Sequence, residues 1–230
     1  MKFGVVVFPG SNCDQDVIYV LEHILGQEVV RLWHKDHDLQ GADFIILPGG
    51  FSFGDYLRSG AIARFSPIMQ EVVRFANNGG YLMGICNGFQ ILAEANLVPG
   101  ALLHNENRKF ICRNSYLKVA TTNSMLTRLA NPDRLLKIPV AHGEGQYFAH
   151  EDTIKLLNDM DSVLFRYCDA NGDMSSESNL NGSIGNIAGV CNAGRNVFGL
   201  MPHPERAADP ILDNQDGLII FESILGMVNA

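Results

Sequence analysis

The sequence predicts an α/β fold with a mainly parallel sheet, flanking helices and an antiparallel extension. In the first half, strand-like apolar runs alternate with segments of helical periodicity, which is typical of a parallel sheet covered by helices. Residues 3–8 form a continuous β-branched and aromatic run, as in a strand buried on both faces. The second half loses this alternation, and its short apolar runs favour antiparallel pairing.

The first half supplies the strands and helices of the parallel part. Strands are expected at residues 3–8, 28–33, 44–47 and 81–85. The first helix is expected after Pro9-Gly10, because apolar residues then recur at helical spacing, at Val17, Val20, Leu21, Ile24 and Leu25. Two more helices are expected, at residues 67–76 and 90–95.

The second half supplies the antiparallel extension. Strands are expected at residues 115–120, 137–140 and 163–167, followed by a hairpin of residues 187–191 and 197–201. The segment 171–186 is rich in Asn, Gly and Ser and predicts a long loop, and residues 217–228 predict a closing apolar helix. Because neither a repeat nor a linker composition interrupts the chain, we expect residues 1–230 to form one domain.

Composition narrows the class of function. The formal net charge is -8, and the basic residues occur singly or in pairs, so we expect no nucleic-acid partner. The N-terminus lacks a secretory pattern and the longest uncharged stretch, residues 75–93, is rich in Gly and Asn. The sequence therefore predicts a cytoplasmic enzyme or binding protein with no membrane segment.

Five cysteines occur at irregular spacings without a C-x-x-C pair. This odd count argues against a disulfide framework and against a zinc site, so no metal is expected. Cys112, Cys168 and Cys191 fall in or beside expected strands and are predicted to be core residues. At least one of the remaining thiols, Cys13 and Cys86, is expected to be reactive.

Cys86 lies in Gly84-Ile85-Cys86-Asn87-Gly88, between an expected strand and an expected helix. A nucleophile on a sharp strand-to-helix turn has a crowded backbone, and small residues two positions before and after it relieve the crowding. Backbone N–H groups at the helix start also favour the thiolate form. The pattern favours a catalytic elbow over the alternative of a small buried hydrophobic residue.

A base for this thiol is expected at Pro202-His203-Pro204-Glu205. The two prolines restrict the backbone around His203 and are expected to hold it in an extended conformation. In an extended chain the side chain of Glu205 projects to the same side and accepts a hydrogen bond from the imidazole. Cys86, His203 and Glu205 therefore predict a Cys-His-acid triad, against the alternative of a solvated turn.

A glycine-rich turn follows the expected strand 44–47. Because parallel strands present their carboxyl ends at one edge of a sheet, Gly49 and Gly50 are expected beside Cys86. The backbone N–H groups of Gly50 and Asn87 are the expected oxyanion donors. The alternatives are an ordinary turn or a phosphate loop, and the Walker A pattern is absent from the sequence.

Together, G-x-C-x-G-x-Q ending at Gln90 and the P-x-H-P-E-like segment ending at Glu205 resemble the motifs of class I glutamine amidotransferases. A narrower resemblance is to the glutaminase subunits of phosphoribosylformylglycinamidine synthase. The segments that carry it are Phe-Pro-Gly-Ser-Asn-Cys-Asp from Phe8, Pro-Gly-Gly-Phe-Ser-Phe-Gly-Asp-Tyr-Leu-Arg from Pro48, Phe-Ile-Cys-Arg from Phe110 and Pro-His-Pro-Glu-Arg-Ala from Pro202. The resemblance extends over essentially the whole chain.

This resemblance implies a flavodoxin-like amidotransferase fold and a division of labour between subunits. Cys86 would attack the side-chain amide of L-glutamine, and a glutamyl thioester would then be hydrolysed to glutamate. Ammonia would pass to a synthetase subunit, which carries ATP and Mg and makes the amidine of purine biosynthesis, with a small third subunit as a further possible partner. No cofactor is expected in this chain.

The resemblance also implies substrate contacts. Gly49, Gln90 and the segment 141–145, with His142, Gly143 and Glu144, are expected to hold the α-amino and α-carboxylate groups of glutamine. The alternative for the 141–145 segment is a polar turn without a binding role. Cys13 is a rival nucleophile, since it also follows a strand, but it lacks the two flanking glycines.

Three other functions remain open from the sequence. One is a glutaminase that serves a different acceptor synthase, and another is a stand-alone amidase of a related cysteine-elbow family. A third, from another class, is a non-catalytic regulatory subunit that keeps the fold. Glutamine turnover that is stimulated by a synthetase indicates an amidotransferase and not a stand-alone amidase. Any turnover that is abolished by Cys86→Ala excludes the non-catalytic subunit.

Overall fold

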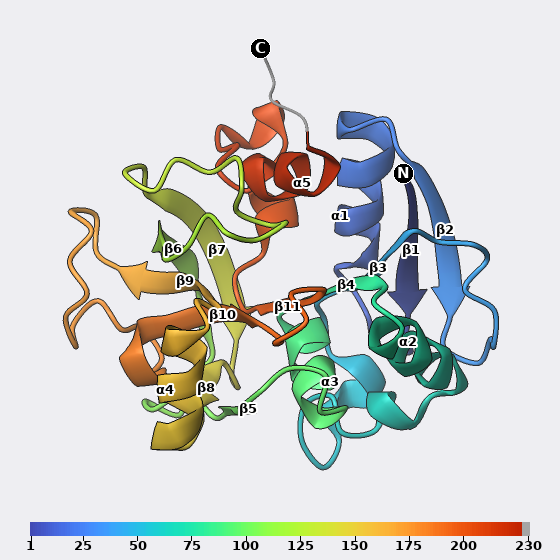
Figure 1. The fold of residues 1–230 in the computed structure, drawn as a ribbon, viewed down its shortest axis with the longest axis horizontal. Coiled ribbons are helices and arrows are strands. Elements are labelled where there is room, and N and C mark those ends of the chain that lie inside the picture. The colour runs from blue at the N-terminus through green and yellow to red at the C-terminus, as the bar shows by residue number, and fades with distance from the viewer. Residues whose placement is uncertain (227–230) are drawn as a thin grey trace.

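The computed structural model describes residues 1–226, and a nine-stranded sheet runs through these residues (Figure 1). The strand order is β2-β1-β3-β4-β11-β10-β9-β6-β7. The bounds are β1 Lys2–Val7, β2 Glu28–Trp33, β3 Phe44–Leu47, β4 Tyr81–Ile85, β6 Ile111–Val119, β7 Leu136–His142, β9 Val163–Cys168, β10 Ile187–Cys191 and β11 Val197–Leu200. A small separate sheet pairs β5 Ala101–Leu103 with β8 Gln146–Phe148.

The sheet has a parallel part and an antiparallel part. Strands β2, β1, β3, β4 and β11 run parallel to their neighbours. From β11 onward, through β10, β9, β6 and β7, each pair is antiparallel. The predicted fold class, a mainly parallel sheet with flanking helices and an antiparallel extension, is confirmed.

The register of the parallel strands places their carboxyl ends at one edge. Leu47 of β3 pairs with Gly84 of β4, and Ile85 of β4 pairs with Leu200 of β11. The segments that follow β1, β3, β4 and β11 therefore emerge side by side. Residues separated by more than a hundred positions in sequence meet at this edge.

Five α-helices flank the sheet within the described residues. They are α1 Asp14–Tyr19, which continues as a π-helical segment Val20–Ile24, α2 Pro67–Asn77, α3 Asn87–Glu94, α4 Glu151–Asp159 and α5 Leu218–Leu225. Figure 1 shows α1 and α5 on one side of strands β4 and β11, and α2 and α3 on the other. The buried apolar residues of the described chain form one cluster that includes both sides of the sheet.

Most predicted elements are present, with differences that have physical causes. Helix α4 and the small β5–β8 sheet were not predicted. Leu157 is the only buried residue of α4, so its helical stripe is a weak signal. The closing helix ends at Leu225, where Gly226 has a φ of 72°, and the last two residues of the predicted range 217–228 lie outside the described residues. Cys112 was expected in the core but is exposed.

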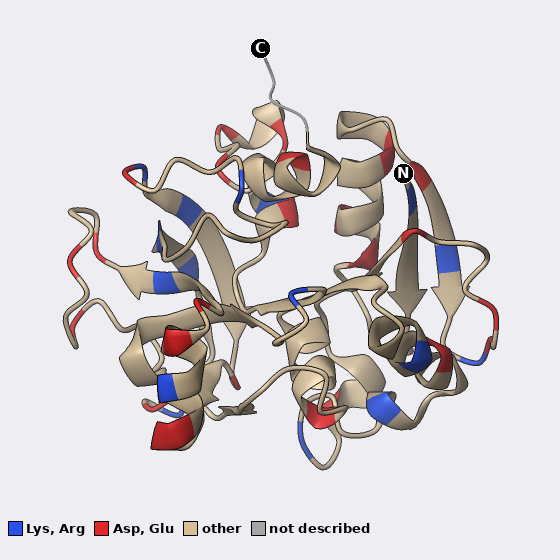
Figure 2. Cartoon of the chain, viewed as in Figure 1, with Lys and Arg blue, Asp and Glu red and all other residues tan. Residues whose placement is uncertain are grey.

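The charged residues are distributed over the whole fold (Figure 2). Figure 2 shows Lys and Arg spread over the parallel and antiparallel parts instead of forming one basic stripe. Among residues 1–226, no helix has the length and apolar character needed to cross a membrane.

Candidate active site

Cys86 occupies a sharp turn between β4 and α3. Its backbone has φ 49° and ψ -104°, a conformation that L-residues rarely adopt and that costs about 1–3 kcal/mol. The surrounding structure holds it, since the Cys86 N–H donates to the Leu200 carbonyl of β11 at 2.8 Å. The side chain is 4% exposed, and Sγ lies 3.7 Å from the Ala141 carbonyl oxygen.

The two glycines beside Cys86 are required by close packing. A Cβ at Gly84 would lie 2.6 Å from the backbone of Gly88, and a Cβ at Gly88 would collide with the Leu47 carbonyl group of β3. Contacts this short do not occur for real Cβ atoms. The elbow geometry therefore allows helix α3 to approach β3 and β4 more closely than any side chain would permit.

His203 and Glu205 form a buried pair after β11. The Nδ1 atom of His203 lies 2.6 Å from Oε1 of Glu205, and both side chains are almost fully buried. His203 itself has non-helical angles, φ -102° and ψ 88°, but Pro204–Ala207 forms a 3₁₀ turn, so the extended chain expected through Glu205 is wrong. The expected contact between the two side chains is nevertheless present.

The surroundings of His203 favour its charged form. Burial lowers the pKa of His203, but the Glu205 carboxylate and the sulfur atoms of Cys86 and Cys13 raise it, and its pKa lies well above the usual value. The Nε2 atom is buried and has no hydrogen-bond partner within residues 1–226. The pair can therefore hold a proton taken from a neighbouring thiol.

A second thiol lies close to the same pair. The Cys13 sulfur, a ring nitrogen of His203 and a carboxylate oxygen of Glu205 all lie within 4.8 Å of one another. Cys13 has relaxed backbone angles, φ -100° and ψ 2°, and its sulfur accepts a hydrogen bond from Arg206 at 3.1 Å. Cys13 was expected only as a rival nucleophile, and its proximity to His203 and Glu205 was not predicted from the sequence.

A cavity of about 160 Å³ opens beside Cys86. It is smaller than the cavities of about 300–1,000 Å³ that hold drug-sized ligands, as suits an amino acid. Cys86 lines it, while Cys13 is not among the lining residues. The lining residues are Gly50, Phe51, Asp55, Ser59, Cys86, Gln90, His104, Phe110, Ala141, His142, Gly143 and Glu144.

The expected oxyanion donors come from two turns at the strand edge. Gly50 has a φ of 137°, and a Cβ there would lie 2.8 Å from the Asn12 nitrogen, so glycine is required. The side chain of Asn87, the first residue of α3, accepts from the Ser52 N–H at 3.1 Å and ties the two turns together. Gly49 does not line the cavity; a Cβ there would lie 2.6 Å from Cε1 of His203.

Gln90 and Glu144 form the polar end of the cavity. The Gln90 side-chain amide donates to the Glu144 carbonyl oxygen at 2.5 Å and accepts from Asn87 at 2.9 Å. The Glu144 carboxylate accepts from the Ser59 N–H at 3.2 Å and lies 3.5 Å from the His104 imidazole. Gln90 thus fixes the turn that carries Glu144, in addition to lining the cavity.

Asp55 adds a second carboxylate that the sequence analysis did not assign to the site. Its Oδ1 accepts from Asn87 at 3.2 Å, and burial, with a contribution from Glu144, raises its pKa to about 6. Asp55 belongs to the quoted glycine-rich segment. An acidic side chain within that glycine-rich segment was the signal that could have identified it.

His142 is the neutral histidine of the site. Burial and the nearby charge of His203 lower its pKa to about 4. Its Nδ1 lies 3.0 Å from Oδ1 of Asn105, which also accepts from the Gly145 N–H at 3.0 Å. This places His142 in the wall of the cavity and gives Asn105, which the sequence analysis did not name, a supporting role.

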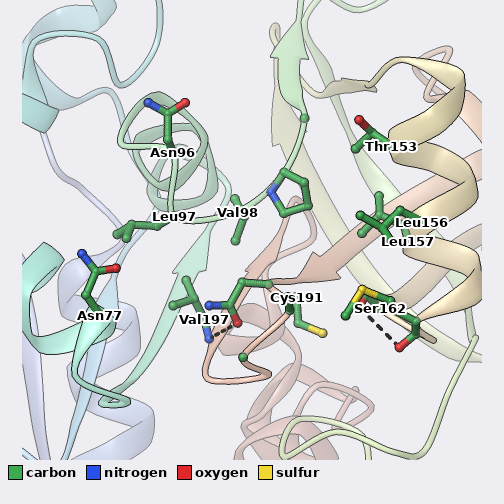
Figure 3. Close-up of a pocket in the computed structure, with 16 residues that line it drawn as sticks. Asn77, Asn96, Leu97, Val98, Thr153, Leu156, Leu157, Ser162, Cys191 and Val197 are labelled. Atoms are coloured by element: carbon green, nitrogen blue, oxygen red, sulfur yellow. Dashed lines mark hydrogen bonds between the residues drawn. The ribbon is translucent and has the colours of Figure 1, made fainter.

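A larger cavity, of about 500 Å³, lies away from this chemistry (Figure 3). Figure 3 shows it between the end of α3, near Asn96 and Leu97, and helix α4, near Leu156. Val197, which also lines it, begins β11, whereas the residues that meet Cys86 follow the other end of that strand. The lining residues carry no charged group or triad residue, so the smaller cavity is the candidate active site.

The sequence of this chain is similar to sequences of known proteins. Residues 1–217 match the family model of the CobB/CobQ-like glutamine amidotransferase domain. The chain is 56% identical over 224 residues to phosphoribosylformylglycinamidine synthase subunit PurQ of Chlorobium luteolum, covering 97% of each chain. The chain belongs to the PurQ family of glutamine amidotransferases.

Other relatives support the same family assignment. The PurQ subunit of a Nostoc strain is 53% identical over 230 residues, which is all of this chain and 99% of that one. A solved structure of PurLQS from Thermotoga maritima matches with a TM-score of 0.86 and 43% identity, covering 98% and 97% of the two chains. The glutaminase domain of Trypanosoma brucei CTPS has a TM-score of 0.61 at 13% identity over 100% of this chain and 96% of that one, a likeness of fold alone.

Proposed function

We propose that this protein is the glutaminase subunit of phosphoribosylformylglycinamidine synthase, with Cys86, His203 and Glu205 as its catalytic residues. The observation that carries the assignment is the buried pair of His203 and Glu205, 2.6 Å apart, behind an elbow cysteine that lines a small polar cavity. Cys86 is the nucleophile because it lines this cavity, whereas Cys13 does not line it and its sulfur accepts a hydrogen bond from Arg206.

The reaction proceeds in two steps. His203 accepts the Cys86 proton, and the sulfur attacks the amide carbon of L-glutamine. The N–H groups of Gly50 and Asn87 stabilise the oxyanion of the tetrahedral intermediate. His203 returns the proton to the leaving nitrogen, so that ammonia departs and a thioester remains. Water then attacks the thioester and gives a proton to His203. The C–S bond breaks, glutamate leaves, and His203 returns the proton to the Cys86 sulfur.

The substrate is held by the polar end of the cavity. The α-ammonium group of glutamine faces the carboxylates of Asp55 and Glu144, which otherwise repel each other. Gln90, His142 and Gly143 shape the wall on that side, and Gly49 provides room for the His203 ring. These roles are supported by the cavity lining and by the raised pKa of Asp55.

Ammonia passes to a synthetase subunit, which uses ATP and Mg to make the amidine in purine biosynthesis. The name PurLQS of the Thermotoga maritima relative supports a synthetase partner and a third component. We further infer that residues 1–230 form one domain, which the single buried apolar cluster of residues 1–226 supports. We also infer that the protein acts in the cytoplasm. The chain itself needs no cofactor for the chemistry described.

The test is labelling with a glutamine-derived chloroketone, followed by intact mass, with and without a candidate synthetase subunit. We expect one adduct on the wild-type chain and on Cys13→Ala, and none on Cys86→Ala. Faster labelling with the synthetase present supports coupling between the subunits. Labelling that persists in Cys86→Ala and disappears in Cys13→Ala would make Cys13 the nucleophile and overturn the assignment.

A further inference from the structure

The thiol of Cys13 has no step in the proposed reaction, yet it is placed against the catalytic pair. Cys13 is 3% exposed and follows β1 at the same edge of the sheet as the elbow. Its sulfur lies within 4.8 Å of a ring nitrogen of His203 and of a Glu205 carboxylate oxygen. Since it does not line the cavity, any role in the reaction must act through these neighbours.

Arg206 connects this thiol to the catalytic turn. It follows Glu205 directly, and its Nη2 donates to the Cys13 sulfur at 3.1 Å. Its Nε donates to Asp16 in helix α1 at 3.2 Å. Burial lowers the pKa of Arg206, but Cys13, Glu205 and Asp16 raise it by more, so the cation is well stabilised. Two acceptors on the Cys13 side thus direct the guanidinium toward α1.

One carboxylate oxygen of Glu205 can still accept a hydrogen bond while Arg206 contacts Cys13 and Asp16. Its Oε1 contacts His203, while Oε2 is buried and has no hydrogen-bond partner within residues 1–226. A buried carboxylate oxygen without a donor is costly and readily accepts from a nearby cation. The Arg206 charge already acts on Glu205 electrostatically. A guanidinium released from Cys13 has this oxygen as its next acceptor.

We infer that Cys13 is a positioning residue whose sulfur holds the Arg206 guanidinium away from Glu205. The Glu205 carboxylate therefore keeps its hydrogen bond with His203 and forms no ion pair with Arg206. An ion pair between Arg206 and Glu205 would place a positive charge next to the imidazolium that forms when Cys86 loses its proton. The imidazolium would be less stable and the thiolate less populated. This inference rests on the proposed function, since it assigns Cys13 a part in the same reaction.

Several groups surround His203 and enter any pH dependence. They are Cys86 from the elbow, Cys13 from the turn after β1, Glu205 and Arg206 from its own turn, and His142 from β7. His142 has a pKa of about 4 and stays neutral above that pH, so it does not titrate between pH 6 and pH 9. In the alkylation experiment below, Cys112→Ala serves as the control for removal of a thiol, because Cys112 is exposed.

The experiment measures the rate of Cys86 alkylation by iodoacetamide from pH 6 to pH 9, by peptide mass analysis of the full chain. The variants are Cys13→Ala, Cys13→Ser, Arg206→Gln and the double variant Cys13→Ala/Arg206→Gln. The pH titration of the His203 Hε1 proton, followed by NMR, gives a second readout. Glutamine kcat/KM with the synthetase subunit gives a third.

We expect Cys13→Ala to lower the Cys86 alkylation rate at pH 7 by about tenfold, the effect of one charge-assisted hydrogen bond. The pH profile should move to higher pH and the pKa of His203 should fall, with KM for glutamine unchanged. Cys13→Ser keeps an acceptor for Arg206 and should behave like wild type. The double variant should recover, because no guanidinium remains to approach Glu205.

Two results would overturn the inference. One is an unchanged alkylation profile in Cys13→Ala, and the other is an equal loss in Cys13→Ala and in the double variant, which would mean that Arg206 is not involved. If Cys13→Ala does not fold, Arg206→Gln decides, since a loss of alkylation rate there contradicts the inference. Failure of the proposed function has a different signature: no glutamine turnover by wild type, with the alkylation differences still present.

Discussion

The turn after β1 and the turn after β4 both carry a cysteine from a strand into a helix, and both cysteines lie beside His203. At Cys86 the backbone has φ 49°, and glycines two positions away allow α3 to pack closely on β3. At Cys13 the backbone is relaxed, and the residue two positions later is the exposed Gln15. Strain and close packing therefore mark the turn whose thiol meets the cavity.

The same comparison separates two ways of using a buried thiol. The Cys86 sulfur lies 3.7 Å from the Ala141 carbonyl oxygen, and Cys86 lines the cavity of about 160 Å³. The Cys13 sulfur contacts Arg206 and Asn12, at 3.1 and 3.3 Å, and Cys13 does not line this cavity. We therefore propose that the two thiols serve His203 differently, Cys86 as the nucleophile and Cys13 as a support, according to what contacts each sulfur.

The largest effect is expected from Cys86→Ala. Glutamine-dependent synthesis by the complex should fall on the order of 10⁴-fold or more, as when a catalytic nucleophile is removed. Ammonia-dependent synthesis should be nearly unchanged, because the synthetase subunit performs that step. Steady-state assays with glutamine and with ammonium chloride test this. Parallel loss of both activities would contradict the division of labour between the subunits.

A smaller effect is expected from Gly88→Ala, with Gln15→Ala as the matched position in the other turn. A methyl group at residue 88 collides with the Leu47 carbonyl and should lower the free energy of unfolding by about 1–3 kcal/mol. Displacement of α3 should also slow chloroketone labelling of Cys86. Residue 15 is exposed and its replacement should change stability by less than about 0.5 kcal/mol.

Thermal and denaturant unfolding measure the loss of stability in Gly88→Ala and in Gln15→Ala, and so compare the two turns. Equal stability of Gly88→Ala and Gln15→Ala would mean that the elbow glycines do not distinguish the two turns.

The smallest effect is expected from Asp55→Asn, which tests the cavity that Cys86 lines and Cys13 does not. Loss of this carboxylate should raise KM for glutamine by about tenfold at pH 7.5, with little change in kcat. Because the pKa of Asp55 is about 6, wild-type KM should rise as pH falls through 6. Initial rates between pH 5 and pH 8 should show this rise in wild type and a flatter dependence in Asp55→Asn.

The same pKa fixes the sign of a stability effect. Burial raises the pKa of Asp55 above its unfolded value, so the folded chain holds this proton more tightly than the unfolded chain. The stabilisation that protonated Asp55 provides is present below about pH 4 and is lost as pH rises through 6. Asp55→Asn without ligand should therefore unfold at a higher temperature than wild type at pH 8. A lower unfolding temperature at pH 8 would contradict this assignment of the pKa.

Local sequence patterns determined much of this protein. The apolar runs of the parallel strands, the glycines around Cys86 and the prolines around His203 each predict a feature that depends on near neighbours in the chain. Backbone conformation and side-chain size act within a few residues, so these features can be recognised without a tertiary structure. The pairing of His203 with Glu205, two residues apart, is predicted from the same kind of local pattern.

Only the tertiary structure decided which of these segments meet. The insertion of β11 beside β4 brings His203 next to Cys86, and the turn after β1 brings Cys13 and Asp16 to Arg206 across 190 or more positions. The contacts of Arg206 with Cys13 and Asp16 were not predicted from the sequence, and the carboxylate of Asp55 was not assigned to the cavity. Strand order and register depend on the packing of the whole sheet, and the charges that surround His203 follow from that packing.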